Sequence, residues 1–262
     1  MVVTPSRAGA RHTLPPEVIW HDLECGAYRA DLPLWRELAE EARLADPAAR
    51  ILDIGAGSGR VALELARAGH HVTALDSAGA LLGALGLRAS GTPVETVEAD
   101  ARSFELAHRD YALCLVPMQT VQLLGGPAGR REMLRAVRAH LRPGGLLACA
   151  IVTELEPFDA ELEGHGPSPE RAHIGAALYE SRALSVRVGR RSIRIERERT
   201  VTPDSCGQAP APTRERNVIE LDRLSAARLH REGGEAGLHD AGTRSVSSTE
   251  EHVGSTVVMF RG

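Results

Sequence analysis

The chain has 262 residues, of which 43% are hydrophobic and 25% charged, a balance typical of a globular protein with a full core. Its formal net charge of −4 excludes an overall basic field that would hold a nucleic-acid backbone, so no nucleic-acid partner is expected. All 31 basic residues are arginines. The absence of lysine excludes Schiff-base chemistry and a Walker A phosphate loop.

The cysteines and the apolar runs exclude further classes. Cys25, Cys114, Cys149 and Cys206 have neither metal-ligand nor C-x-x-C spacing. Cys114 and Cys149 lie in apolar runs, and we interpret them as buried hydrophobic residues. No apolar run approaches the roughly 20 residues of a membrane span, and the first residues lack a secretion signal. We therefore expect no membrane partner and a cytoplasmic location.

The N-terminal region is expected to be a flexible tail over residues 1–14, followed by a helical segment. A helix begins near Pro33, and its apolar face consists of Leu34, Leu38 and Ala42. The aromatic residues Trp20 and Tyr28 precede this helix. They either anchor the segment to the core or form a lid over a bound ligand, and both interpretations are open.

The most informative stretch is Ile51–Arg60, ILDIGAGSGR, which predicts a short buried strand, a glycine turn and a helix that runs to Ala68. Glycine lets the backbone turn tightly and approach a ligand closely. A dinucleotide loop would read G-x-G-x-x-G and leave its helix N-terminus free for a pyrophosphate. Here Asp53 stands two residues before the first glycine. It would repel a pyrophosphate and suits a ligand with ammonium and sulfonium centres, such as S-adenosylmethionine.

At this decamer the chain resembles the class I S-adenosylmethionine-dependent methyltransferases, whose first motif is an acidic residue followed by G-x-G-x-G. The resemblance implies S-adenosylmethionine as the cofactor, bound by Asp53, Gly55, Ala56, Gly57 and Gly59. Many small-molecule members carry a segment similar to Tyr28–Pro33, which implies that Tyr28 covers the methionine end of the cofactor. A nicotinamide-binding turn remains the alternative.

Two further carboxylates follow the next strands. Strand Val72–Leu75 ends in Asp76-Ser77, where a carboxylate can accept hydrogen bonds from both ribose hydroxyls or can cap the following helix. Strand Pro93–Val97 leads to Asp100-Ala101-Arg102. The resemblance implies that Asp100 accepts from the adenine amino group and that the amide of Ala101 reaches a ring nitrogen, with a solvated loop as the alternative.

A fourth apolar strand, Tyr111–Val116, ends where open α/β sheets bind ligands. Amino-group methyltransferases of DNA carry [DN]-P-P-[FYW] at this point, whereas this chain has Val-Pro-Met-Gln and resembles small-molecule enzymes. We expect Val116 to contact the cofactor. The residues expected to line the acceptor pocket are Met118, Gln119 and Gln122, although both amides suit a helix cap equally well.

The remaining core elements complete the fold. Residues 128–142 predict an amphipathic helix whose arginines form a solvated face, ended by Arg142-Pro143-Gly144-Gly145 and followed by a fifth strand over 146–152. This alternation predicts an α/β fold with a Rossmann-like doubly wound sheet of five parallel strands. A helix from Ala226 to Ala236, capped by Ser225, and a closing antiparallel strand pair end the chain.

An antiparallel β insert is expected after the fifth strand. Its β-rich runs are Ala177–Val188, Ser192–Val201 and Arg214–Leu221, the first two joined by a hairpin at Gly189-Arg190-Arg191, with a long loop over 203–212. It either covers the acceptor site, mediates dimerisation or is purely structural. The expected organisation is a tail (1–14), a cofactor-binding core with a helical lid (15–153), the insert (154–223) and the closing elements (224–262).

These patterns predict a methyltransferase that acts on an amine or hydroxyl of a small-molecule acceptor, as a monomer or homodimer. The insert is similar to that of enzymes methylating amino sugars, glycine and other natural-product acceptors. The alternatives are a nicotinamide-dependent oxidoreductase and a non-catalytic S-adenosylmethionine-binding protein. No catalytic residue is assigned; His165 and His173 of the insert are the histidines closest to the expected pocket, or ordinary surface residues. Glu154, Glu156 and Asp159 are spaced like an acidic loop, so no metal site is expected.

Overall fold

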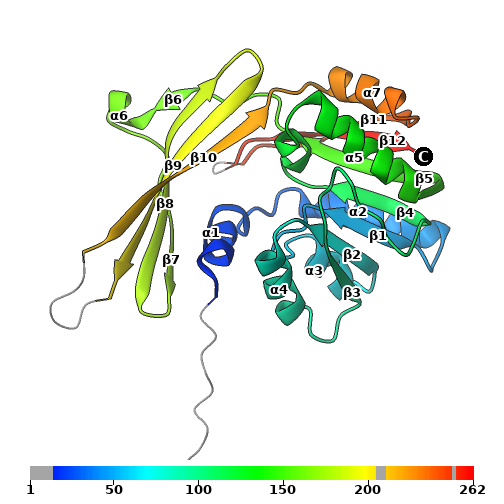
Figure 1. Cartoon of the computed structure of the whole chain (residues 1–262), viewed down its shortest axis with the longest axis horizontal. Helices are drawn as coiled ribbons and strands as arrows, with labels where there is room; N and C mark the ends of the chain where they lie inside the picture. The colour runs from blue at the N-terminus through cyan, green and yellow to red at the C-terminus, as the bar shows by residue number, and fades with distance from the viewer. Residues whose placement is uncertain (1–13, 205–210, 250–251) are drawn as a thin grey trace, which may run out of the picture.

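The computed structural model describes residues 14–204, 211–249 and 252–262. Nearly all of the predicted tail, Cys206 and most of the loop over 203–212 lie outside these residues. The described chain forms a seven-stranded and a five-stranded sheet (Figure 1). None of the helices in this part of the protein has the length and apolar character needed to cross a membrane.

The seven-stranded sheet has the order β11-β12-β5-β4-β1-β2-β3. Five of its strands are mutually parallel: β1 (Arg50–Ile54), β2 (His71–Asp76), β3 (Val94–Glu98), β4 (Tyr111–Val116) and β5 (Leu141–Ile151). β12 (Ser255–Arg261) runs antiparallel to β5, and β11 (His239–Val246) antiparallel to β12. This confirms the predicted parallel sheet with its closing antiparallel pair.

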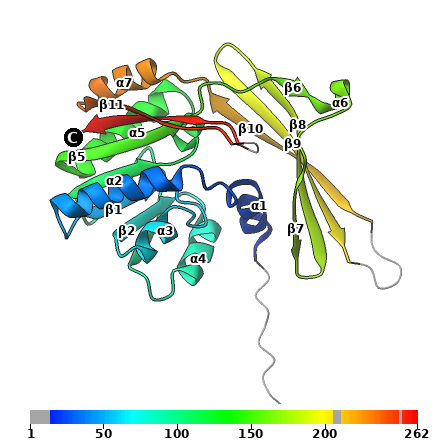
Figure 2. The same cartoon turned by 180° about the vertical axis from the view of Figure 1, so that it is seen from behind.

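Helices cover both faces of this sheet, which is why β4 is apolar and buried at every position (Figure 2). One layer consists of α2 (Leu32–Ala45), α3 (Ala62–Arg67) and α4 (Gly79–Arg88), and the other of α5 (Pro127–His140) and α7 (Ala226–Glu235). Ile51 belongs to the first layer's core and its neighbour Leu52 to the second, as strand alternation requires. Cys114 and Cys149 are buried free thiols, as predicted.

The five-stranded sheet, here called the accessory sheet, is entirely antiparallel. It has the order β10-β9-β8-β6, with β7 also paired to β8. The bounds are β6 (Phe158–Asp159), β7 (Glu170–Ile174), β8 (Ala177–Val188), β9 (Ser192–Pro203) and β10 (Thr213–Asp222). The hairpin between β8 and β9 is confirmed, because Gly189 N donates to Ser192 O (2.8 Å). β6, β7 and the short helix α6 (Ala160–Glu163) were not predicted.

The accessory sheet stands beside the carboxyl ends of the parallel strands. Its strand β10 contacts η1 (Thr120–Leu123), the 3-10 turn that follows β4. In both views α1 (Pro16–Cys25) lies between this sheet and the core (Figures 1 and 2). Trp20 packs edge-on against Tyr179 of β8 at 5.2 Å, and Asp22 accepts hydrogen bonds from Ser58 and Arg88 of the core. α1 therefore joins the two sheets.

Two expectations for residues 128–145 are wrong. Arg130 does not lie on a solvated face: it is 1% exposed and donates to both carboxylate oxygens of Glu232 (2.7 and 2.8 Å) and to Asp222. Arg142–Gly145 are part of β5 rather than a separate turn. They continue the strand because Gly144 N donates to Gly262 O (3.0 Å) and Gly262 N donates to Gly145 O (2.9 Å).

Candidate cofactor and acceptor site

The glycine turn between β1 and α3 is fixed to β2 by its backbone. Gly55, Gly57 and Gly59 have φ values of 72°, 55° and 98°, a region that favours glycine. The amides of Gly55 and Ala56 both donate to Leu75 O (2.8 and 3.0 Å), and Gly57 N donates to Asp76 Oδ2 (2.8 Å). The carboxyl ends of β1 and β2 thus form one preorganised edge.

Two side chains that the sequence did not single out lie over this turn. A Cβ added to Gly55 would fall 2.5 Å from Cγ2 and 2.6 Å from Oγ1 of Thr120, and one added to Gly57 would strike the imidazole of His21. Ser58 donates to Asp22 and lies 3.2 Å from His21 Nδ1, so α1 is held directly on the loop. A ligand bound on the glycines would therefore meet Thr120 and His21.

Asp53 provides the test of whether this turn fits a cationic cofactor. Its side chain is 0% exposed, and within the described residues neither carboxylate oxygen has a hydrogen-bond partner. Burial raises the pKa of Asp53 to about 7, although Arg60 and the Ala62 amide favour its charged form. An unpaired buried carboxylate is costly unless a cation or a proton joins it. The residue thus fits the ammonium group of S-adenosylmethionine and does not fit a pyrophosphate.

Asp76 lies at the carboxyl end of β2 and does not cap α4. Its Oδ1 accepts from Ala78 N (2.9 Å) and its Oδ2 from Gly57 N, while the N-cap residue of α4 is Ala78, without a side-chain hydrogen bond. The capping alternative is therefore wrong. Ser77 is exposed beside it. A carboxylate keeps lone pairs beyond these two bonds, and the ribose contact remains a prediction.

The proposed adenine residues lie at the end of β3. Asp100 forms a paired contact with Arg102, with Nε–Oδ1 at 3.0 Å and Nη2–Oδ2 at 2.6 Å. These hydrogen bonds lower the pKa of Asp100. Ala101 is half-buried between them. The side chain of Val116 is 0% exposed in the core, so only its main chain can contact a cofactor.

Tyr28 is linked to the glycine turn through Arg60. The Arg60 guanidinium lies 5.2 Å from the centre of the Tyr28 ring, and its Nη1 donates to Tyr28 O (3.0 Å). The same guanidinium forms a buried bidentate pair with Asp31 (2.6 and 2.8 Å). Tyr28 is 6% exposed, so this pair fixes a buried aromatic ring beside the loop. Contact between Tyr28 and the cofactor remains a prediction.

The segment after β4 contains a strained residue. Among the described residues, Met118 is the only non-glycine residue with positive φ (54°). Such backbone strain is concentrated at functional sites. Gln119 occupies the N-cap position of η1 without a side-chain cap, so its amide is not used in that way. Both residues are half-buried at the carboxyl end of the sheet, and their contact with the acceptor remains a prediction.

The prediction for Gln122 is wrong. Its Nε2 donates to Val152 O (3.1 Å) and Asp222 O (2.9 Å), and its Oε1 accepts from Val152 N (2.8 Å). The side chain is 1% exposed. Gln122 therefore ties η1 to β5 and β10, and both N–H donors of its amide are already used.

The remaining polar candidates lie elsewhere. Trp20 is 5% exposed between Tyr179 and the Arg199 guanidinium, which is the anchoring position; its contact with an acceptor remains a prediction. His165 is exposed, and His173 is an exposed partner of Asp204 (3.7 Å). Asp159 caps α6 through the amides of Glu161 and Leu162. Across residues 14–204, 211–249 and 252–262, no group of side chains could hold a metal ion.

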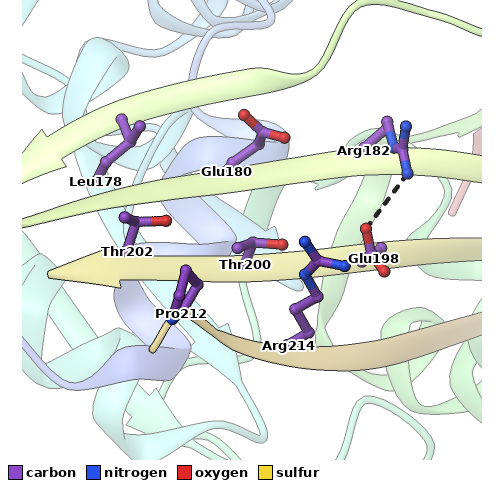
Figure 3. A pocket seen from close by; sticks show the side chains of 8 residues that line it. All are labelled: Leu178, Glu180, Arg182, Glu198, Thr200, Thr202, Pro212 and Arg214. Atoms are coloured by element: carbon purple, nitrogen blue, oxygen red, sulfur yellow. Dashed lines mark hydrogen bonds and ion pairs between the residues drawn. The ribbon is translucent and has the colours of Figure 1, made fainter. Parts of the chain in front are cut away.

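A hollow of about 330 Å³ lies on the accessory sheet, but on the face away from α1 (Figure 3). From β8 it is lined by Leu178, Glu180 and Arg182, which alternate with the Tyr179 and Ser181 that contact α1. Successive side chains of a strand point to opposite faces. This hollow is therefore distinct from the glycine turn, and we assign no acceptor to it.

Comparison with known proteins agrees with this geometry. Residues 51–145 match the protein-family model of the methyltransferase domain. No curated protein matches the chain in sequence.

Solved structures match the accessory sheet as well as the core. The S-adenosylmethionine-bound amino pentose methyltransferase CalS10 from Micromonospora echinaspora is 23% identical, with a TM-score of 0.66 over 97% of this chain and 100% of that one. The sugar N-methyltransferase KedS8 from a Streptoalloteichus species is 17% identical, with a TM-score of 0.65 over 100% and 99%. The CcbJ methyltransferase from Streptomyces caelestis is 18% identical, with a TM-score of 0.64 over 95% and 98%.

The glycine turn, the strand order and the matched domain lead to one assignment. Residues 51–145 match a methyltransferase domain, and the described chain has the fold of the class I S-adenosylmethionine-dependent methyltransferases.

Proposed function

We propose that the protein transfers a methyl group from S-adenosylmethionine to an amino group of a small polar acceptor, with amino sugars as the leading class. The observation that carries the cofactor is Asp53, a buried carboxylate without a partner directly below the glycine turn. The acceptor class is supported by the similar structures, which include an amino pentose methyltransferase and a sugar N-methyltransferase. Both match this chain over almost its whole length, the accessory sheet included.

Each end of the cofactor has a candidate partner in this arrangement. Asp53 would pair with its ammonium group, Asp76 would accept from its ribose hydroxyls, and Asp100 and Ala101 would bind its adenine. Tyr28, held by Arg60 and Asp31, would cover its methionine end. The bound cofactor supplies an electrophilic methyl group on a sulfonium centre.

The protein's contribution to this reaction is alignment and exclusion of water. Met118, Gln119 and Thr120 follow the carboxyl end of β4, where an acceptor would approach, and Thr120 lies against Gly55. Fixing two reactants in line can contribute about 7–11 kcal/mol. A neutral amine has a free lone pair and needs no base, so we assign no catalytic residue, whereas a hydroxyl acceptor would require one.

Calorimetric titration tests the cofactor first. We expect binding of S-adenosylmethionine and S-adenosylhomocysteine and no binding of nicotinamide dinucleotides. Binding of a nicotinamide dinucleotide without binding of S-adenosylmethionine would instead support an oxidoreductase. Transfer of a labelled methyl group to a panel of amino sugars and phenols then distinguishes an enzyme from a binding protein. Labelled phenols without labelled amines would overturn the amine assignment. The cytoplasmic location and the monomeric or homodimeric state remain predictions from the sequence.

A further inference from the structure

The face of the accessory sheet that is turned toward α1 carries a group of polar side chains. In an antiparallel sheet, residues directly opposite one another share a face. Arg199 of β9 stands opposite Ser181 of β8, and Arg197 stands opposite Asn217 of β10. Ser181 donates to Glu24 of α1 (2.8 Å), which establishes that this is the face toward α1.

The guanidinium of Arg199 already binds other residues of the protein. It donates to both carboxylate oxygens of Glu24 (2.7 and 2.8 Å), lies 3.5 Å from Glu215 and stacks over Trp20. Its guanidinium therefore holds α1 to the accessory sheet. Arg197, the next residue of β9 on the same face, is therefore the cation that can still bind a ligand.

Arg197 has donors to spare. Only its Nη1 is used, in a hydrogen bond to Glu170 (3.0 Å) and a longer contact with the Ser181 hydroxyl (3.4 Å). In the part of the chain that the structure describes, its Nε and Nη2 donate to nothing. The side chain is 19% exposed, so a ligand can reach these N–H groups. A guanidinium in such a position favours an oxygen acceptor.

Asn217, directly opposite Arg197, has a hydrogen-bond acceptor that receives no donor from the described residues. Its Oδ1 is buried, and no described residue donates to it. A buried amide oxygen without a donor is destabilising, and each such group in a folded protein needs an explanation. Arg197 does not satisfy it, although the two are cross-strand neighbours. The pair thus presents an unused acceptor beside unused donors.

This pair lies on the same face of the accessory sheet as Ser181 and Arg199, which contact Glu24 of α1. Cys25, the last residue of α1, is half-buried, and loss of solvent raises the pKa of its thiol to about 11. Both Arg197 and Arg60 act on that thiol in the opposite direction. α1 contacts the accessory sheet through Glu24 and the glycine turn through Asp22, so the polar pair and the cofactor loop both lie beside this helix.

We propose that Asn217 and Arg197 form a subsite that binds hydroxyl groups on the non-reacting part of the acceptor. A hydroxyl can donate to Asn217 Oδ1 while it accepts from Arg197 Nε or Nη2, which is the combination that both residues lack. A ring with adjacent hydroxyl groups satisfies both at once, whereas a hydrocarbon ring satisfies neither. The inference rests on the proposed function, because it takes the bound molecule to be the methyl acceptor.

The test compares two amines of the same ring size, glucosamine and cyclohexylamine. Binding of each is measured by saturation-transfer NMR with S-adenosylhomocysteine present, and methylation by transfer of a labelled methyl group. We expect Asn217→Leu to lower binding of glucosamine and its kcat/KM roughly tenfold, the effect of one lost buried hydrogen bond. Cyclohexylamine and the cofactor Kd should change less than twofold. Thr200→Val, on the opposite face of the same sheet, is the matched control and should change neither amine.

The outcomes separate the subsite from the reaction. Equal losses for both amines in Asn217→Leu, or no binding of glucosamine to the wild-type protein, would overturn the subsite. Binding of glucosamine that depends on Asn217, without methylation of any amine or phenol, would retain the subsite and overturn the proposed function. If Asn217→Leu does not fold, the wild-type preference for glucosamine over cyclohexylamine decides, and its absence contradicts the proposal.

Discussion

The imidazole of His21 lies over the α-carbon of Gly57, so that a methyl group added at position 57 would collide with the ring. The φ of Gly57 is 55°, which costs an L-residue about 1–2 kcal/mol. We expect Gly57→Ala to displace α1 from the glycine turn and to abolish detectable cofactor binding. Calorimetric titration with S-adenosylmethionine measures the binding, and a thermal melt measures the accompanying loss of stability.

Gly83 provides the matched control for this substitution. It lies within α4, has nothing within 4 Å of an added Cβ and does not have positive φ. Gly83→Ala should therefore bind the cofactor as the wild type does and be up to about 1 kcal/mol more stable, because alanine favours a helix. Normal cofactor affinity in Gly57→Ala would show that the ligand does not lie on this turn.

Asp53 should make the stability of the cofactor-free protein depend on pH. Its pKa is about 7 when folded and near 3.8 when unfolded, so between these values the folded state holds the extra proton. The stabilisation that protonated Asp53 contributes at low pH is then lost as the pH rises from about 4 to about 7. The free energy of unfolding falls by on the order of 4 kcal/mol over this range. Urea unfolding of wild type and Asp53→Asn at pH 5 and pH 8 tests this: the difference between the two proteins should shift in favour of the variant at pH 8.

The raised pKa of Asp53 also predicts that the protein releases a proton when the cofactor binds. An ammonium group placed beside Asp53 favours its charged form, so a protein that is protonated at pH 6 should lose a proton when S-adenosylmethionine binds. Calorimetry at pH 6 in buffers with different ionisation enthalpies measures this release. A binding enthalpy that is the same in every buffer would exclude Asp53 as the ammonium partner.

Local patterns predicted the elements well, and contacts between distant segments account for the errors. β4 and β8 have the predicted bounds, because their apolar or alternating runs end at a glycine or a turn. Arg130 was expected on a solvated face, since its partners Asp222 and Glu232 are 92 and 102 residues away. His21 was overlooked for the same reason: its contact with Ser58 spans 37 residues, and nothing in either local sequence indicates that they meet.

Asp76 should affect both the cofactor and the loop. We expect Asp76→Ala to weaken S-adenosylmethionine binding by about 1–3 kcal/mol, because buried hydrogen bonds to the ribose are lost. It should also lower stability, since Gly57 N and Ala78 N lose their acceptor. Calorimetry and urea unfolding separate the two effects. Asp110→Ala, at an exposed carboxylate just before β4, is the control and should change neither. Unchanged affinity in Asp76→Ala would remove Asp76 from the site.

The buried ion pairs of Arg130 should matter far more than those of the arginine beside it. Removing the Arg130 side chain leaves the carboxylates of Glu232 and Asp222 without their main partner, and breaking such a buried pair costs about 3–5 kcal/mol. Arg131, its neighbour on α5, is more exposed, and its ion pair with Glu235 is long (3.8 Å). The loss of such a surface pair costs about 0–1 kcal/mol. We therefore expect Arg130→Ala to lower the free energy of unfolding several times more than Arg131→Ala in urea titrations.

Arg130→Ala should also loosen the accessory sheet, because Asp222 ends β10 and accepts from Gly126 N (2.7 Å). Faster amide hydrogen exchange in β10 would report this loosening. Equal losses of stability in the two variants would mean that Asp222 and Glu232 find other partners and that the triad does not hold the accessory sheet to the core.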